Sequence, residues 1–167
     1  LFCYSKAIEH NSDVSVLYCD EDSFENAGCF KSPSLKDSRL NIDLLYTHNC
    51  ITHFLVVRKS DLIEIGLSND NVSGAQDYDL VLRMLHAKKK FFHIPRVLYH
   101  WRMHSSSTNG GNALSKPYAE EAGRLALQQH FNARGIHGIV RFTNEPFVYK
   151  MEYSLSDPKP LVSIIIP

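Results

Sequence analysis

The sequence predicts an α/β fold. The apolar, β-prone run Val14-Ser15-Val16-Leu17-Tyr18-Cys19 follows a turn signal and has the pattern of a buried strand. Further β-prone runs alternate along the chain with segments whose apolar residues recur at helical spacing. With 167 residues, 44% hydrophobic and 22% charged, the chain has the composition of a globular domain with a core.

The first part of the chain predicts a helix, the buried strand, a loop and a short helix. Residues 1–8 place apolar side chains at helical spacing, so the chain is expected to begin inside a helix. After the strand, residues 23–38 contain Gly and Pro and little periodicity. We expect them to form a loop across the top of the sheet, with a short strand at residues 29–30. Residues 41–46 are expected to form a short helix.

The middle of the chain predicts a strand followed by two helices. Residues 50–58, CITHFLVVR, are β-rich enough to predict a central strand. A brief helix is expected from Ser60, as its N-cap, to Gly66. A longer amphipathic helix is expected to begin at Asp77 and to end at the lysines of residues 88–90. A carboxylate is therefore expected at a helix N-terminus.

Next, two short strands, a polar loop and a long helix are expected. The strands are residues 91–94 and 97–101, on either side of Pro95. The helix has Ser115 as its expected N-cap and ends at Gly135.

From residue 139 onward the pattern changes. Apolar and polar residues alternate over residues 147–155, which predicts a half-buried strand. Residues 157–160, Asp-Pro-Lys-Pro, indicate a linker, and the closing apolar run of residues 161–167 has the pattern of a buried strand that belongs to a following domain. The expected parts are residues 1–135, a small β-rich linker segment at 136–160, and the first strand of a further domain at 161–167.

Composition argues against several classes of function. The net charge is +0 and the only basic run is residues 88–90, which does not favour nucleic acid as a partner. The sequence has no apolar stretch of the ~20 residues that a transmembrane segment requires. Its four cysteines lack C-x-x-C spacing, so we expect reduced thiols of a cytoplasmic protein, with neither a disulfide nor zinc.

An acidic triplet, Asp20-Glu21-Asp22, directly follows the strand of residues 14–19. In open α/β sheets, ligands bind in the crevice at the carboxyl ends of the strands. Two carboxylates separated by one residue repel each other unless a cation lies between them, and hard oxygen ligands suit Mg²⁺ or Mn²⁺ that bridges to phosphates. A solvated acidic turn is the alternative reading of so short a motif.

Three motifs, in this order, resemble the bacterial family-2 glycosyltransferases of the GT-A fold. They are Tyr18-Cys19-Asp20-Glu21-Asp22, Gly74-Ala75-Gln76-Asp77-Tyr78-Asp79-Leu80 and His93-Ile94-Pro95-Arg96-Val97-Leu98-Tyr99-His100-Trp101-Arg102-Met103-His104-Ser105. The resemblance covers residues 1–135 and implies the C-terminal half of a partial GT-A domain, a Rossmann-like nucleotide-diphospho-sugar transferase fold. Residues 162–167 resemble the first strand of another copy, as in tandem enzymes that build cell-surface polysaccharide.

The resemblance implies an inverting, metal-dependent glycosyltransferase. The implied donor is a nucleotide sugar, the acceptor a growing glycan or lipid-linked glycan, and the cofactor Mn²⁺ or Mg²⁺. The remaining domains of the same polypeptide are implied partners, and the implied location is the cytoplasm, including the inner face of the bacterial membrane as a peripheral site. Without the half that holds the nucleoside, these 167 residues alone are expected to bind the donor weakly or not at all and to show no transfer. Residues 14–19 are expected to leave an exposed apolar edge.

The resemblance also assigns roles to residues. Asp77 matches the general base, and Asp22 matches the last acidic position of the Asp-x-Asp motif and is the best metal ligand. Asp20 would share the ion or face the ribose. His104 matches a histidine that completes the coordination, and an imidazole ligand mildly favours manganese. The expected substrate-binding residues are Asp20, Gln76, Trp101 and Arg102. Asp20, Asp22, Asp77 and His104 are expected to converge on one face.

Simpler roles stay open for several of these residues. Asp77 also suits a helix cap, Trp101 a core position, and Arg102 a surface loop. The histidines on the apolar strands, His93 and His100, are expected to be hydrogen-bonded core residues, and His53 is a weak match to a position near the acceptor.

Two other classes of function compete with the glycosyltransferase. One is a non-catalytic carbohydrate-binding or scaffolding remnant of a tandem glycosyltransferase. The other is a Mg²⁺-dependent phosphohydrolase, which requires a nucleophilic aspartate together with a catalytic lysine or a second acid pair. The sequence shows no such arrangement.

Overall fold

The computed structural model describes residues 1–25, 29–66, 70–103 and 117–166. The helices are α1 (Phe2–His10), α2 (Ile42–Leu45), α3 (Lys59–Ile65), α4 (Gln76–His86) and α5 (Pro117–Ala133), with a 3-10 turn at Asp70–Val72. The strands are β1 (Val16–Phe24), β2 (Val56–Val57), β3 (Phe91–Arg102), β4 (Gly138–Phe142) and β5 (Tyr149–Tyr153). The fold is therefore mixed α/β, as predicted.

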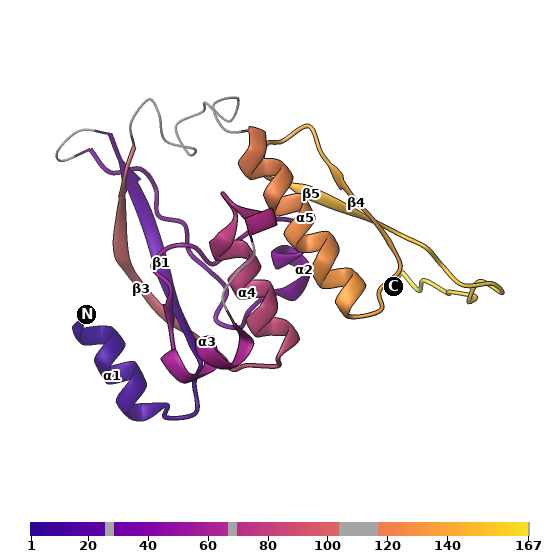
Figure 1. Cartoon of the computed structure of the whole chain (residues 1–167). Coiled ribbons are helices and arrows are strands. Elements are labelled where there is room, and N and C mark those ends of the chain that lie inside the picture. Colours follow the sequence, from indigo (N-terminus) through magenta and orange to yellow (C-terminus); the bar gives the residue numbers. More distant parts are fainter. Residues whose placement is uncertain (26–28, 67–69, 104–116, 167) are drawn as a thin grey trace.

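The main sheet has the strand order β2-β1-β3, so β1 is its central strand (Figure 1). β1 pairs antiparallel with β2 and parallel with β3. The expectation that residues 14–19 leave an exposed edge is wrong, because strands flank β1 on both sides and residues 14–19 are all buried. The acidic triplet also lies within β1, which continues to Phe24, rather than beyond its end.

The central strand expected at residues 50–58 is also wrong. Only Val56 and Val57 form a strand, at the edge of the sheet. The preceding backbone bonds to side chains instead: Lys36 donates to the carbonyls of Thr52 and His53, and the His53 N–H donates to a glutamate. High β propensity does not form a strand where backbone groups already have other partners.

β3 is one strand rather than two, and its pairing with β1 is irregular at Pro95. Cys19 pairs with Ile94 and Asp20 with Val97, so Pro95 and the residue after it have no partner on β1. A second shift follows between Asp20 and Glu21. Proline has no N–H to donate and is tolerated in strands at such bulges. The additional residues of the irregularity lie on β3, opposite the part of β1 that carries the carboxylates.

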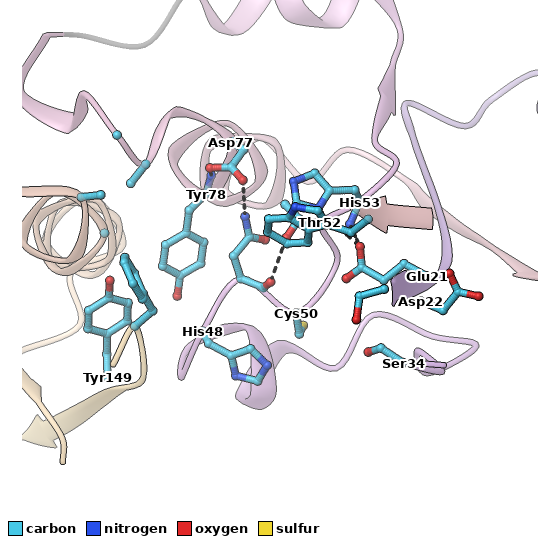
Figure 2. Close-up of a pocket in the computed structure, with 18 of the residues that line it drawn as sticks. Glu21, Asp22, Ser34, His48, Cys50, Thr52, His53, Asp77, Tyr78 and Tyr149 are labelled. Atoms are coloured by element: carbon cyan, nitrogen blue, oxygen red, sulfur yellow. Dashed lines mark hydrogen bonds and ion pairs between the residues drawn. The ribbon is translucent and has the colours of Figure 1, made fainter. Parts of the chain in front are cut away.

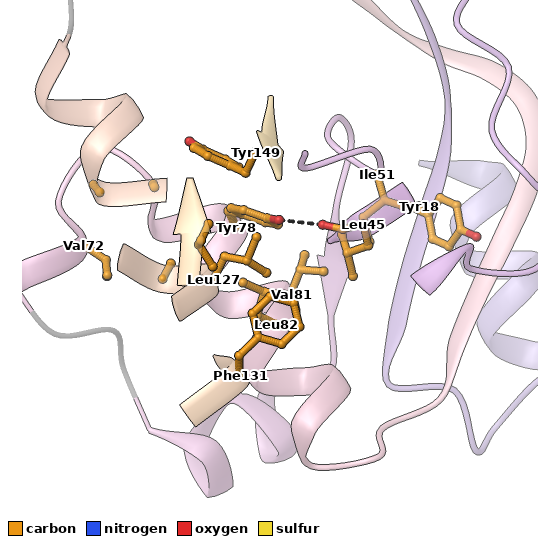
Figure 3. Packing of buried hydrophobic residues seen from close by; sticks show 14 residues of the cluster. Tyr18, Leu45, Ile51, Val72, Tyr78, Val81, Leu82, Leu127, Phe131 and Tyr149 are labelled. Atoms are coloured by element: carbon orange, nitrogen blue, oxygen red, sulfur yellow. Dashed lines mark hydrogen bonds between the residues drawn. The ribbon is translucent and has the colours of Figure 1, made fainter. Parts of the chain in front are cut away.

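Two hydrophobic clusters occupy opposite faces of the main sheet. Leu17 and Cys19 pack with Tyr4 of α1, whereas Tyr18 belongs to the larger cluster, which includes residues of α4 and α5. Figure 3 shows the larger cluster, in which the Tyr78 hydroxyl donates to the carbonyl of Leu45 at 2.5 Å. Because residues on both faces are buried, β1 reads in the sequence as a continuous apolar run.

The helices expected near residues 1–8, 41–46, 77–90 and 115–135 are confirmed as α1, α2, α4 and α5. Two expected caps differ from the structure: α3 has Arg58 at its N-cap instead of Ser60, and α4 has Ala75 there, so Asp77 lies in the first turn. Ser115 lies outside the described residues. No helix in the described part of the chain is long and apolar enough to cross a membrane.

The segment expected to be a β-rich linker is a β4–β5 hairpin that packs on α5 (Figure 1). The Tyr149 hydroxyl donates to the carbonyl of Glu120 on α5 at 2.9 Å, and the Tyr149 N–H donates to the carbonyl of Thr47 at 2.7 Å. Residues 154–166 then continue as irregular chain, with exposed apolar side chains at residues 161, 162 and 164–166. Their assignment to a following domain stays a prediction.

Candidate functional site

A cavity of about 660 Å³ lies between the C-terminal half of β1, the N-terminus of α4 and the β4–β5 hairpin. Figure 2 shows its lining: Asp22 lies at one side, Tyr149 at the other, and Asp77 and Tyr78 between them in this view. Most of the polar groups are at the β1 side, whereas the hairpin side is lined by aromatic and small residues. Such a cleft, in which polar groups converge opposite an apolar wall, is typical of a small-molecule site.

Asp22 and Glu21 both face the cavity. Asp22 has an Oδ1 atom 2.6 Å from Nδ1 of His100, and its side chain is 13% exposed. His100 is itself exposed, so its expected place in the core is wrong. The contact with His100 orients the Asp22 carboxylate, which lines the cavity.

Glu21 holds the segment of residues 52–53 in place. Its Oε2 accepts the backbone N–H of His53 at 2.7 Å and lies 3.3 Å from the Nδ1 of the same residue. Beneath it, the buried Nζ of Lys36 donates to the carbonyls of Thr52 and His53 and lies 3.7 Å from Oε1 of Glu21. Burial lowers the pKa of Lys36, and the nearby Glu21 opposes that shift. Sequence reasoning missed both residues, because a single Lys in a polar loop and the middle residue of an acidic triplet carry no specific signal.

Asp20 points away from the cavity, into the protein. Its Oδ1 accepts the backbone N–H of Lys36 at 2.9 Å and lies 2.8 Å from Nε2 of His93. His93 is buried and stacks on Tyr18, which confirms it as a hydrogen-bonded core histidine. The structure thus places the two aspartates differently, with Asp20 in the interior and Asp22 at the cavity.

Asp77 is exposed and lines the cavity from the first turn of α4. Its Oδ2 accepts from the Asn49 side-chain amide at 3.2 Å, and its Oδ1 accepts the N–H of Tyr78 at 2.9 Å. These bonds fix the orientation of the carboxylate at the cavity. Asn49 was not expected at the site, and its Oδ1 is buried without a partner among the described residues.

Trp101 also lines the cavity, next to His53. The two rings meet edge to face with centroids 4.6 Å apart, and His53 stacks on Tyr99 at 5.2 Å. Trp101 is half-buried and is not part of either core cluster in the described chain. It therefore presents a ring to the cavity.

Gln76 and Arg102 are not among the described residues that line the cavity. Gln76 accepts the N–H of Gly74 through its Oε1 at 3.1 Å, and the guanidinium of Arg102 lies over the ring of Phe24 at 5.4 Å. His104 lies outside the described residues. The structure thus brings Asp22, Asp77 and Trp101 to one cavity.

The described residues supply only some of the ligands that a divalent cation requires. Within the described ranges, no group of three His, Cys, Asp or Glu side chains is arranged to hold a metal. Asp22 offers a carboxylate at the cavity, already oriented by His100. Mg²⁺ is commonly held by one or two carboxylates, with substrate phosphates and water as its other ligands. The residues present are compatible with a cation of that kind.

At the far side of the cavity, Tyr78 and Tyr149 stack with centroids 6.2 Å apart. Burial raises the pKa of both hydroxyls far above the usual range, so both stay protonated as donors. Phe147 and Gly123 complete this wall.

Sequence comparisons identify two longer relatives. The chain is 36% identical over 165 residues, or 97% of its length, to the uncharacterized protein y4gI of Sinorhizobium fredii. It is 33% identical over 155 residues, or 93% of its length, to the O-antigen biosynthesis protein RfbC of Myxococcus xanthus. The chain spans 18% of the first protein and 12% of the second. No protein-family model matches it.

Proposed function

We propose that this chain is part of a glycosyltransferase of the GT-A type that acts in polysaccharide biosynthesis. The observation that carries the proposal is that Asp22 and Asp77, from different elements, line one cavity. The similarity to an O-antigen biosynthesis protein supports the same class of function. The proposed reaction transfers a sugar, with inversion, from a nucleotide donor to a hydroxyl of a glycan or lipid-linked glycan. The rest of the polypeptide and a cytoplasmic setting, at the inner face of the membrane, belong to the proposal.

Asp77 is the proposed general base. An attacking hydroxyl requires a carboxylate within hydrogen-bond reach, and such proton transfer typically contributes about 10²–10⁴-fold. Asp77 is exposed at the cavity, and Asn49 orients it through one carboxylate oxygen. This bond and the one from the Tyr78 N–H fix the orientation of the carboxylate at the cavity, where the proposed acceptor would lie.

Asp22 is the proposed ligand of Mn²⁺ or Mg²⁺, together with oxygens of the donor diphosphate and with His104. The cation, when bound, would neutralise the charge that develops on the leaving diphosphate. The contact between His100 and Asp22 would fix the orientation of the carboxylate, as is usual for groups that support a metal ligand. Trp101 is the proposed wall against the substrate.

A non-catalytic carbohydrate-binding domain is the second candidate. The observation that favours it is the short contact between Asp22 and His100, which satisfies one carboxylate oxygen without any cation. A binding domain of this kind would bind glycans without consuming a sugar nucleotide.

The test is donor binding by the complete polypeptide. Isothermal titration with UDP-glucose, UDP-galactose, GDP-mannose and dTDP-rhamnose, with and without Mn²⁺, should identify a donor whose binding requires the metal. Asp22→Ala should abolish the metal-dependent part. Asp13→Ala is the matched control, because Asp13 is an exposed carboxylate paired with Lys90 and lies outside the cavity. Metal-independent binding, or equal losses in both variants, would refute the role of Asp22.

A further inference from the structure

The turn between β4 and β5 holds one residue in an unusual conformation. Phe147 has a φ of 59°, in the left-handed region that side-chain-bearing residues seldom adopt. Its N–H donates to Oε1 of Glu120 on α5 at 3.0 Å. Within the turn, Thr143 donates through its hydroxyl to the carbonyl of Val148 at 2.9 Å. The backbone is therefore held in this conformation by specific bonds from two directions.

Core packing does not account for the aromatic side chain at this position. Phe147 is half-buried, and in the described chain it belongs to neither hydrophobic cluster nor to the residues packed against them. It lines the cavity instead. Residues kept in sparsely populated conformations concentrate at functional sites, where the surrounding structure enforces them.

The wall beside Phe147 is rigid. Tyr149 is buried, its hydroxyl is bonded to α5, and a Cβ added at Gly123 would lie only 2.2 Å from that hydroxyl oxygen. Gly123 therefore lets the hairpin approach α5 closely enough for both Phe147 and Tyr149 to reach the cavity. Figure 2 shows Tyr149 at the side of the cavity opposite Asp22.

We infer that Phe147 is the platform for a sugar ring of the acceptor, and the inference rests on the proposed function. If Asp22 holds the donor diphosphate, the space beyond Asp77 remains for the molecule whose hydroxyl Asp77 deprotonates. A pyranose has one face formed mainly of C–H groups, which suits contact with an aromatic ring. Phe147 thus selects acceptors that end in a pyranose with such an apolar face.

The test measures acceptor binding without any need for turnover. Saturation-transfer NMR on the complete polypeptide, with Mg²⁺ and UDP present, uses the methyl glycosides of glucose, galactose, mannose and rhamnose as probes. We expect at least one to bind, Phe147→Gly to weaken that binding at least tenfold, and Phe147→Tyr to keep it within threefold. Phe142→Gly is the control, because Phe142 is an exposed aromatic on the same hairpin and lies outside the cavity.

A stability measurement separates this role from a structural one. Glycine adopts the left-handed conformation without strain, which offsets the lost contacts of the half-buried ring and the greater freedom of glycine in the unfolded chain. Phe147→Gly should therefore melt within about 4 °C of the parent, a shift that corresponds to about 1 kcal/mol. Unchanged glycoside binding in this variant, a larger fall in melting temperature, or no bound glycoside in the parent protein would overturn the inference. If sugar nucleotides bind and glycosides bind equally to the parent and to Phe147→Gly, the inference fails while the proposed function stands. If glycoside binding depends on Phe147 but no sugar nucleotide binds, the transferase proposal fails and the sugar platform remains.

Discussion

Gly123→Ala should destabilise the protein, although alanine is the better helix former. A Cβ at this position of α5 would lie 2.2 Å from the Tyr149 hydroxyl oxygen and 3.0 Å from its Cζ, so the ring must move. Overpacking of this kind costs about 1–3 kcal/mol, and loss of the bond to Glu120 costs about 0.5–1.5 kcal/mol. Alanine recovers about 1 kcal/mol of helix propensity. The net loss should be about 0.5–3.5 kcal/mol in the free energy of unfolding.

A double-mutant cycle with Tyr149→Phe isolates the contact. Removing the hydroxyl takes away the closest atom, and the next, Cζ at 3.0 Å, needs a shift of only a few tenths of an ångström. The double variant should therefore be more stable than the two single losses added together, by about 1 kcal/mol or more. Urea unfolding gives these values, and each kcal/mol should also lower Tm by about 2–4 °C. A Gly123→Ala variant as stable as the parent would refute the tight packing of the hairpin on α5.

Two further predictions concern protonation and the base. His130 is buried, and its pKa is lowered to about 4, first by burial and then by the charge of Arg134. As the pH falls below about 6.5, the unfolded chain therefore binds a proton at His130 while the folded chain does not. The free energy of unfolding should thus fall by up to about 3 kcal/mol between pH 6.5 and 4. Urea unfolding at several pH values should show a shallower fall in His130→Leu than in the exposed control His10→Leu. Equal dependence on pH in the two variants would contradict the role of His130. Asn49→Ala should lower kcat about tenfold or more with donor affinity unchanged, because it removes the hydrogen bond to the Asp77 carboxylate; steady-state kinetics with an unchanged kcat would exclude Asn49 as a positioning residue.

Helical periodicity was enough to predict the helices, and a continuous apolar run was enough to predict β1 as a buried strand. The pattern from Asp77 to the lysines corresponds to α4, and the continuous apolar run before Asp20 corresponds to a strand buried on both faces. These signals are local, and tertiary packing agrees with them. The same local signal misled at residues 50–58, where the partners of the backbone are Lys36 and Glu21, side chains distant in sequence.

The site was predictable in part. Asp22, Asp77 and Trp101 do line one cavity, but spacing alone could not separate Asp20 from Asp22. Their surroundings differ through partners on another strand, His93 for Asp20 and His100 for Asp22. The sequence also did not predict that the hairpin lines the cavity. The hairpin approaches α5 closely because Gly123 has no side chain, whereas a glycine in a helical sequence indicates only low helix propensity.

In the proposed active site, Asp77 is the base and Asp22 is the donor-side group. Their roles are tested by comparing Asp77→Asn with the parent enzyme, with kcat and donor Kd determined on the complete polypeptide. We expect kcat to fall by about 10²-fold or more while donor Kd stays within about twofold, since the change removes proton acceptance and little ground-state contact. A kcat near that of the parent, or a loss of donor affinity equal to that of Asp22→Ala, would contradict the proposed roles of Asp77 and Asp22.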